Sequence, residues 1–166
     1  MKKILAKASK IKVVLTDVDG VLTDGGMYYT KHGDIMKKFH VRDGMGVTLL
    51  RKNNIPSIIV TKEKNEIIKQ WSKKMKIHKL LMGVIKKETI LERLCKIYNV
   101  KYSEVCYIGD DVNDLGLLKI VGLSVTPSDG IFEAQKICDY VCKNKGGNGV
   151  FREVADMILL SQKVKL

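Results

Sequence analysis

The stretch Val13-Val14-Leu15-Thr16-Asp17-Val18-Asp19-Gly20 decides the predicted fold, because a short apolar run ends there in two aspartates and a glycine. Four further apolar runs have the length and the branched side chains of buried strands, at 57–60, 80–82, 105–108 and 123–125. Residues at helical spacing, such as Ile67, Trp71 and Met75, lie between these runs. Strands that alternate with helices join in parallel through right-handed crossovers, so we expect an α/β domain with a doubly wound, Rossmann-like parallel sheet.

Residues 26–40 break this alternation. They hold two tyrosines, a turn around 31–34 and a second run at 35–39, a pattern that predicts a β-hairpin projecting from the sheet. No repeat, low-complexity tract or linker divides the 166 residues. We therefore expect one domain over 1–166, with the basic segment 1–10 as an N-terminal arm.

Composition narrows the class of protein. The hydrophobic content of 45% is ordinary for a soluble chain, and no apolar run approaches the ~18 residues that span a bilayer, so we expect no membrane partner. The net charge of +12 comes from dispersed lysines, a pattern that favours a solubilising surface over a nucleic-acid interface. Four cysteines without a Cys-x-x-Cys pair indicate reduced thiols, and the lack of a signal-peptide pattern predicts a cytoplasmic protein.

Reactive side chains follow the predicted strands. Asp17 and Asp19 follow the first run, Thr61 the second, Lys87 the third, and Gly109-Asp110-Asp111-Val112-Asn113-Asp114 the fourth. In an open α/β sheet these positions meet at one edge, where ligands bind. Carboxylates gathered there repel one another, and Mg²⁺ is the natural ion to neutralise them beside a phosphate. The set predicts phosphoryl transfer, with one carboxylate as nucleophile and a second for proton transfer.

Other interpretations of Asp17-Val18-Asp19-Gly20 fit less well. A calcium-binding EF-hand loop that began at Asp17 would need glycine at position 22 and glutamate at position 28, where the chain has Leu22 and Tyr28. A solvated turn explains the two aspartates but not the ordered threonine, lysine and second aspartate motif that follow. A receiver domain carries its aspartate pair at the first strand, whereas here the Asp-Asp pair comes last.

The four motifs together resemble those of the haloacid dehalogenase-like phosphatases, from about Ile11 to Leu160. Within that superfamily, the stretches 19–25, 39–44 and 146–153 resemble the 3-deoxy-D-manno-octulosonate 8-phosphate phosphatase family. That family includes a branch that acts on nine-carbon ulosonate 9-phosphates. The resemblance implies a HAD-like fold and a magnesium-dependent phosphatase.

The resemblance also implies a role for each motif residue. Asp17 would be the nucleophile that forms an aspartyl phosphate, and Asp19 the general acid and then the general base. Mg²⁺ would be held by Asp17, the Asp19 backbone carbonyl and Asp110. Thr61 and Lys87 would bind the phosphoryl oxygens.

Two further aspartates of the fourth motif would support the site. By the same resemblance, Asp111 and Asp114 would orient neighbouring residues. For Asp114, a simple helix cap remains an alternative.

The spacing of the motifs leaves no room for a separate cap domain. Only 41 residues separate Asp19 from Thr61, and 48 separate Thr61 from Asp110. A site open to water handles a small substrate poorly, so either the substrate is large or neighbouring subunits supply the cover. The resembling family forms homotetramers in which the hairpin and the glycine-rich tail reach adjoining subunits. Gly146 to Glu153 are therefore candidates for this cover, with a plain turn before a helix as the alternative.

The expected substrate-binding residues come from the same resemblance and from the positions at which this chain departs from the family's pattern. Octulosonate phosphatases typically follow the motif threonine with Gly-Arg, whereas this chain has Lys62-Glu63. Glu63-Lys64-Asn65 with Lys74 looks more like the nine-carbon branch, and the stretch 41–44 retains the octulosonate pattern. The candidate substrate-binding residues are Asp19, Arg42, Asp43, Gly44, Glu63 and Lys74.

The leading hypothesis is a cytoplasmic, magnesium-dependent phosphatase that releases an eight- or nine-carbon 3-deoxy-ulosonate, a precursor of cell-surface glycans such as lipopolysaccharide or sialic acid. Two alternatives stay open. One is a capless phosphatase that acts on nucleic acid or protein, and the other is a non-catalytic basic binding module.

Overall fold

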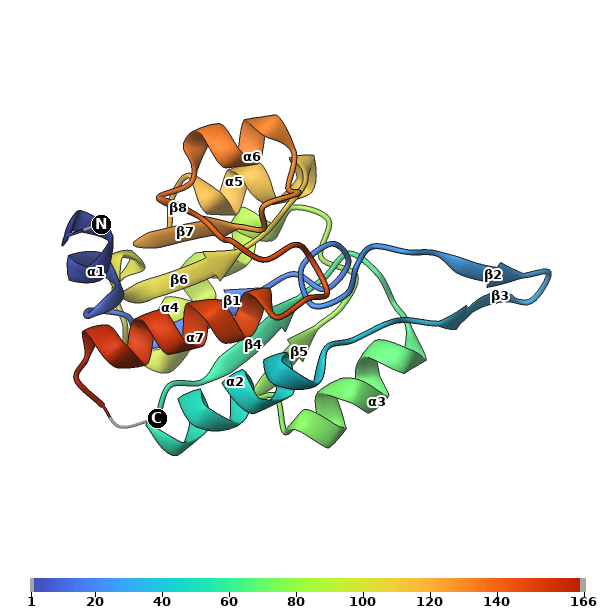
Figure 1. The fold of residues 1–166 in the computed structure, drawn as a ribbon, viewed down its shortest axis with the longest axis horizontal. Coiled ribbons are helices and arrows are strands. Elements are labelled where there is room, and N and C mark those ends of the chain that lie inside the picture. Colours follow the sequence, from blue (N-terminus) through green and yellow to red (C-terminus); the bar gives the residue numbers. More distant parts are fainter. Residues whose placement is uncertain (1, 165–166) are drawn as a thin grey trace.

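The computed structural model describes residues 2–164 and builds them around one six-stranded sheet (Figure 1). All neighbouring strands in it are parallel, in the order β5-β4-β1-β6-β7-β8. The strands are β1 (Val13–Thr16), β4 (Ser57–Val60), β5 (Lys79–Leu81), β6 (Val105–Ile108), β7 (Leu123–Thr126) and β8 (Tyr140–Val141). The predicted doubly wound α/β fold is confirmed, and β8 adds a short strand that the sequence did not predict.

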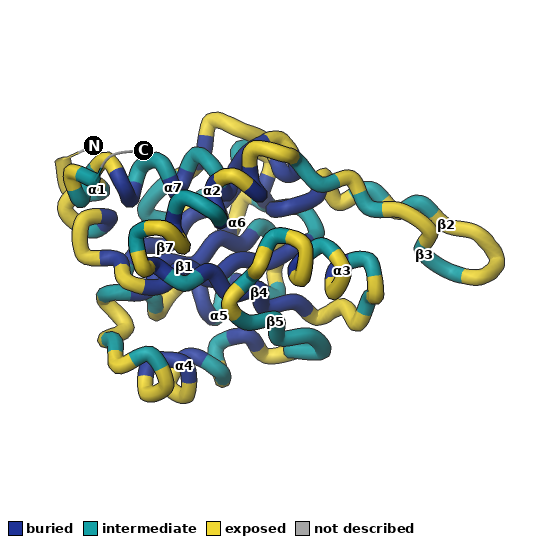
Figure 2. The backbone as a smooth tube through the Cα atoms, turned by 90° about the horizontal axis from the view of Figure 1, so that it is seen from below, coloured by how far each residue is buried: buried dark blue, intermediate teal, exposed yellow. Residues whose placement is uncertain are grey.

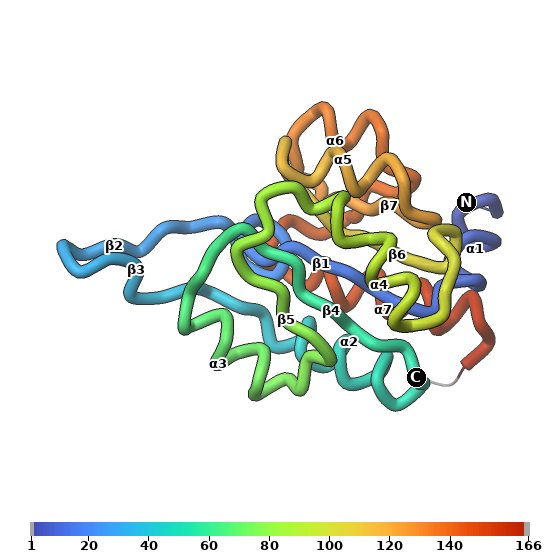
Figure 3. The backbone as a smooth tube through the Cα atoms, turned by 180° about the vertical axis from the view of Figure 1, so that it is seen from behind, coloured from blue at the N-terminus to red at the C-terminus, as the bar shows by residue number. Residues whose placement is uncertain are grey.

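Helices cover both faces of the sheet, as Figures 1 and 3 show from opposite sides. One face carries α1 (Lys2–Ala8), α2 (Val41–Lys52), α3 (Glu66–Met75) and α7 (Val150–Ser161). The other carries α4 (Leu91–Tyr98), α5 (Leu115–Leu118) and α6 (Phe132–Ile137), with the short 3₁₀ helices η1 (Lys87–Ile90), η2 (Tyr102–Glu104) and η3 (Val112–Asp114) in the connections. Every residue of β1, β4, β6 and β7 is buried, as expected for parallel strands that are covered by helices on both faces.

The predicted hairpin is present and extends beyond the carboxyl ends of the strands. It consists of β2 (Tyr28–Thr30) and β3 (Gly33–Met36), which pair in antiparallel fashion. Figure 2 shows its outer end exposed, while its root is tied to the domain by a bridge between Thr23 and Phe39. The Phe39 ring also stacks on Trp71 of α3, with ring centroids 4.6 Å apart. The hairpin therefore leaves the domain from a fixed base.

The basic N-terminal segment does not extend away from the domain. Its residues 2–8 form α1, which packs on α7, and Lys7 pairs with Asp139. Within residues 2–164, no helix is both long and apolar enough to cross a bilayer.

Candidate active site

A cleft of about 470 Å³ lies at the carboxyl ends of the central strands. Its lining residues come from the loops after β1, β4 and β6: Asp17, Asp19, Thr61, Lys62, Glu63, Asp110, Asp111, Val112 and Asn113. A larger hollow of about 1040 Å³ lies at the opposite edge, where the strands begin, and it contains none of the motif residues. The sheet therefore gathers residues that are nearly a hundred positions apart into one place, as expected for this topology.

The loop after β1 brings two aspartates together. The backbone N–H of Asp17 donates to the carbonyl of Ile108 at 2.9 Å, which continues the β1–β6 ladder into the site. Gly20 has a φ of +82°, and a Cβ there would lie 2.0 Å from Oδ2 of Asp110. Glycine is therefore required both for the turn and for the close approach of the second carboxylate.

A buried lysine connects the carboxylates. Lys87, at the start of η1, has no solvent exposure, and its Nζ lies 2.7 Å from Oδ2 of Asp17 and 2.6 Å from Oδ1 of Asp114. The hydroxyl of Tyr107 on β6 also donates to Oδ1 of Asp114. Two carboxylates thus share one ammonium in a desolvated setting, where charge pairing is essential.

Asp114 acts on its neighbours rather than on the cleft. Its Oδ2 accepts from the backbone N–H of Asp110 at 2.9 Å and of Asp111 at 3.2 Å, and its Oδ1 is taken by Lys87 and Tyr107. The bond to Asp111 N–H also forms half of a capping box at η3. Asp114 therefore makes contacts of both kinds, since it orients its neighbours and also caps η3.

The carboxylates suit a divalent cation. Asp17, Asp110 and Asp114 each offer an oxygen within 4.8 Å of the others. The oxygens of Asp114 already have hydrogen-bonding partners, whereas Oδ1 of Asp110 is buried without one. A buried carboxylate oxygen without a donor is costly and calls for a ligand, so Asp17 and Asp110 are the pair that fits Mg²⁺.

The pKa values of these carboxylates reflect their crowding. Burial raises the pKa of Asp110 to about 8, with further contributions from Asp114 and Asp17. Burial also raises the pKa of Asp17 to about 7, although Lys87 partly opposes that shift. Burial works against the charge of Lys87, but Asp17 and Asp114 outweigh it and raise the pKa of that lysine. The metal-free site therefore holds protons near neutral pH that a cation must displace.

Mg²⁺ binding is accordingly expected to strengthen as the pH rises through 7 to 8. Below these pKa values the two carboxylates are protonated, so binding should release about one to two protons at pH 6 and almost none at pH 9. Titration calorimetry in buffers of different ionisation enthalpy measures this number directly. The matched variant Asp110→Asn should lose most of the affinity, and an affinity that stayed constant from pH 6 to pH 9 would contradict the assignment.

Thr61 closes the other side of the cleft. It follows β4, is nearly buried, and its backbone N–H donates to Leu81. Its hydroxyl oxygen accepts from the backbone N–H of Glu63 at 3.1 Å, which leaves the hydroxyl proton free to point into the cleft. Lys62 and Glu63 continue the same wall, so the loop 61–63 offers a hydroxyl, a cation and a carboxylate.

Asp19 is held by a residue that the sequence analysis did not single out. Its Oδ1 accepts from Nζ of Lys37 at 2.8 Å and from the hydroxyl of Thr23 at 3.2 Å. Lys37 lies at the root of the hairpin and also contacts Asp34 at 3.1 Å. Nothing in the local pattern distinguishes Lys37 among the 30 Lys and Arg residues of the chain.

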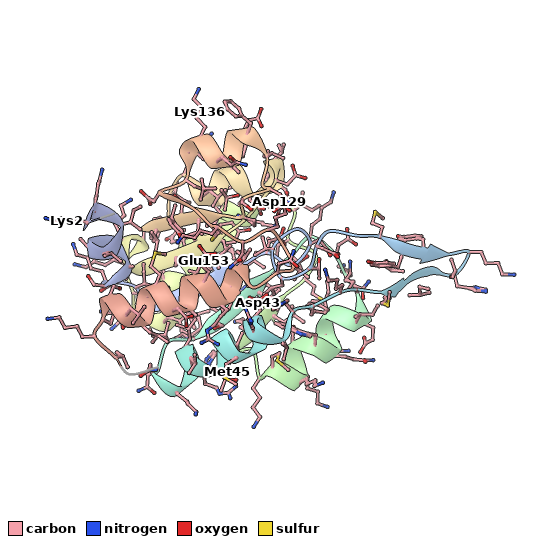
Figure 4. All side chains as sticks on the ribbon, viewed as in Figure 1. Lys2, Asp43, Met45, Asp129, Lys136 and Glu153 are labelled. Atoms are coloured by element: carbon pink, nitrogen blue, oxygen red, sulfur yellow. The ribbon has the colours of Figure 1, made fainter. Side chains whose placement is uncertain are left out.

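The structure corrects two of the proposed substrate residues. Asp43, on α2 beside the first turn of α7 (Figure 4), is fully buried and accepts from the backbone N–H of Arg152 at 2.9 Å. Burial raises its pKa to about 6. Gly44 allows α2 to approach α3, because a Cβ there would lie 2.3 Å from Sδ of Met75. Both residues serve helix capping and packing, and neither reaches the cleft.

The other proposed substrate residues divide by position. Asp19 and Glu63 line the cleft. Arg42 lines a separate hollow of about 660 Å³ beside α7, and Lys74 is exposed on α3. The lysine that lines the cleft together with Glu63 is instead Lys62.

The glycine-rich stretch 146–149 packs against the loop of the same chain that carries Asp19. Gly147 donates from its backbone N–H to Val21 at 3.0 Å, and a Cβ on Gly146 would lie 2.1 Å from the carbonyl oxygen of Gly20. Glu153 orders the approach to this stretch, since its carboxylate accepts from the backbone N–H groups of Lys143 and Asn144. The stretch thereby braces the β1 loop from outside.

Residues 51–154 match a family described as haloacid dehalogenase-like hydrolase. The 3-deoxy-D-manno-octulosonate 8-phosphate phosphatase KdsC of Haemophilus influenzae is 37% identical over 94% of this chain and 87% of its own length, and that of Escherichia coli is 35% identical over 96% and 85%. The crystal structure of the Moraxella catarrhalis phosphatase of the same name, in complex with a magnesium ion, a phosphate ion and KDO, superposes with a TM-score of 0.94 at 34% identity, covering 98% of this chain and 94% of that one.

Proposed function

The chain belongs to the 3-deoxy-D-manno-octulosonate 8-phosphate phosphatase family of haloacid dehalogenase-like hydrolases, and from that membership we propose that it hydrolyses the phosphate monoester of a 3-deoxy-2-ulosonic sugar acid with Mg²⁺. The observation that carries the proposal is the meeting of Asp17, Asp110 and Thr61 at one cleft, with the buried Lys87 paired to Asp17. The eight-carbon candidate for the substrate is the 8-phosphate given in the relatives' name. The nine-carbon candidate is a 9-phosphate of ketodeoxynonulosonate or N-acylneuraminate.

The proposed reaction begins with attack by Asp17. One oxygen of Asp17 is tied to Lys87 at 2.7 Å, so the other is free to attack phosphorus in line with the leaving oxygen. The P–O bond to the sugar breaks as the aspartyl phosphate forms, and Asp19 gives its proton to the departing sugar oxygen. Asp19 then takes a proton from the water that attacks this intermediate, so that inorganic phosphate leaves and Asp17 is regenerated.

The remaining residues stabilise the charge that develops on the phosphoryl oxygens. The Thr61 hydroxyl would donate to them, and the third N–H of Lys87, beside Asp17, would donate to the phosphoryl group once it is on Asp17. Asp17, Asp110 and the backbone carbonyl of Asp19 would hold Mg²⁺, which when bound screens the carboxylates from the incoming phosphate.

Lys62 and Glu63 are the proposed contacts to the sugar acid. Lys62 supplies a cation for the substrate carboxylate, and Glu63 supplies acceptors for sugar hydroxyls.

The cleft remains open beside Lys62 and Glu63, and the hairpin exposes Met27, Tyr29 and Ile35 beyond it. We infer that the chain works as a homotetramer in which a neighbouring hairpin completes the cover, and light scattering that gave a monomer mass would overturn this part.

A substrate panel tests the proposed function. Phosphate release with Mg²⁺ should show at least about a tenfold higher kcat/KM for octulosonate 8-phosphate or a nonulosonate 9-phosphate than for a nucleotide or a phosphopeptide, because only the sugar acids satisfy Lys62 and Glu63 together. Glu63→Gln should reduce the difference in kcat/KM between the two sugar-acid phosphates, since it removes the negative charge of the side chain but keeps its shape. Equal or better turnover of the nucleotide or the phosphopeptide would favour a macromolecular substrate instead.

A further inference from the structure

Lys37 is, after Lys87, a second lysine whose side chain is buried between two carboxylates. Its side chain is only 5% exposed, although it lies at the root of a hairpin whose outer end is open to solvent. Its Nζ contacts Oδ1 of Asp19 at 2.8 Å and Oδ2 of Asp34 at 3.1 Å. An ammonium group removed from water to this extent is stable only when its partners are fixed in place.

Both side-chain contacts to Asp19 fall on one oxygen. Lys37 and the Thr23 hydroxyl donate to Oδ1, and no residue within 2–164 donates to Oδ2. Asp19 also lines the cleft. The carboxyl group is therefore anchored through Oδ1, and Oδ2 is the oxygen left to carry a proton to or from the substrate.

The ammonium of Lys37 is itself held from a second element. Oδ2 of Asp34 accepts from the side-chain amide of Asn65 at 3.1 Å, and Oδ1 of Asn65 accepts from the backbone N–H of Ile67 at the start of α3. The chain of contacts thus runs from Asp19 through Lys37 and Asp34 to Asn65, four residues after Thr61. These contacts connect Asp19, the proposed acid, to the loop that carries Thr61, the proposed phosphate-binding residue.

We propose that Lys37 is a positioning residue that aims Oδ2 of Asp19 at the leaving oxygen, with Asp34 and Asn65 holding Lys37 in place. The proposal rests on the proposed function, in which Asp19 gives a proton to the sugar oxygen as the P–O bond breaks. Accurate aim matters when the leaving group is a sugar alkoxide, because an alkoxide needs that proton. It matters little for p-nitrophenolate, which leaves as a stable anion.

The test compares two leaving groups in matched variants. Lys37→Met should lower kcat/KM for the preferred sugar-acid phosphate by roughly 10- to 100-fold and that for p-nitrophenyl phosphate by less than about threefold. The ratio kcat/KM is the readout because it reports the steps up to departure of the leaving group and leaves out hydrolysis of the aspartyl phosphate, in which Asp19 acts as base for both substrates. Lys37→Arg keeps a cation and a donor and should recover part of the loss. Lys38→Met is the control, because Lys38 is half exposed on the same hairpin and pairs with Asp24 instead.

The variant Asp19→Asn separates failure of this inference from failure of the proposed function. If Asp19→Asn loses the sugar-acid phosphate selectively while Lys37→Met loses both substrates equally or neither, the positioning role of Lys37 is wrong and the role of Asp19 stands. If Asp19→Asn itself lowers kcat/KM equally for both substrates, the role of Asp19 as acid to the leaving oxygen is wrong, and the positioning role of Lys37 falls with it. Thermal melts and Mg²⁺ titrations of each variant establish that the comparison concerns folded, metal-binding protein.

Discussion

Asp17→Asn is expected to lower phosphate release from the sugar-acid phosphate by about 10⁴-fold or more. The asparagine keeps the size of the side chain and one carbonyl oxygen for Lys87, whose Nζ lies 2.7 Å from Asp17. It removes the anionic oxygen that attacks phosphorus, and Asp114, the other carboxylate paired with Lys87, is fully engaged by its own partners. The measurement is release of inorganic phosphate at saturating Mg²⁺.

The control and a direct chemical probe sharpen this prediction. Asp24→Asn removes a carboxylate from the same loop but outside the cleft lining, and it should retain activity within about threefold. Borohydride added during turnover should reduce an aspartyl phosphate at position 17 to homoserine, which mass spectrometry detects. Asp17→Asn protein that released phosphate at a rate within tenfold of the unaltered chain would show that a different group attacks.

The sheet was predictable because its strands are buried on both faces. β1, β4, β6 and β7 each consist of four buried residues, and such strands are visible as short apolar runs. β8 has only two residues and exists through its pairing with β7, which no local pattern indicates. The helix α1 was likewise hidden in a segment that looked like a basic arm, because its docking on α7 is a tertiary contact.

The centre of the site was predictable for a topological reason. Asp17 and Thr61 directly follow neighbouring strands of a parallel sheet, and Asp110 lies one residue beyond a third. The carboxyl ends of such strands must meet at one edge. Side chains whose role depends on packing between distant elements were not predictable. Asp43 belongs to a stretch that resembles a substrate motif, yet its carboxylate caps the first turn of α7. Lys37 reaches Asp19 only because the hairpin folds back at its root.

The buried charges of the site are unbalanced when no metal is bound. Asp17, Asp110 and Asp114 face a single buried cation, Lys87. The pKa values of about 7 for Asp17 and about 8 for Asp110 show that the folded chain relieves this imbalance by holding protons. A group whose pKa is raised by folding contributes stability below its unfolded pKa and loses that contribution as the pH rises through its folded pKa. The metal-free protein should therefore weaken between about pH 4 and pH 8.

Lys87→Met is expected to be the most destabilising single change in the site, lowering the free energy of unfolding by roughly 3–5 kcal/mol at pH 8 without Mg²⁺. Methionine fills much of the same space, but it leaves Asp17 and Asp114 facing each other without a cation in a desolvated setting. The loss should shrink toward pH 5, because protonation of Asp17 then removes part of the repulsion. Urea unfolding at both pH values measures this difference.

A double variant tells whether the unpaired charge, rather than lost packing, causes this loss. Lys87→Met combined with Asp114→Asn removes one cation and one anion together, so it should recover part of the stability at pH 8 while phosphate release stays about 10³-fold below that of the unaltered chain. Lost packing alone would instead give the same cost at pH 5 and pH 8 and no recovery in the double variant. If Lys87→Met lowered the free energy of unfolding by less than about 1 kcal/mol at pH 8, water would have to reach Lys87, Asp17 and Asp114 in solution, because only a solvated ion pair is so weak. The full burial of Lys87 between the two carboxylates argues for the larger value.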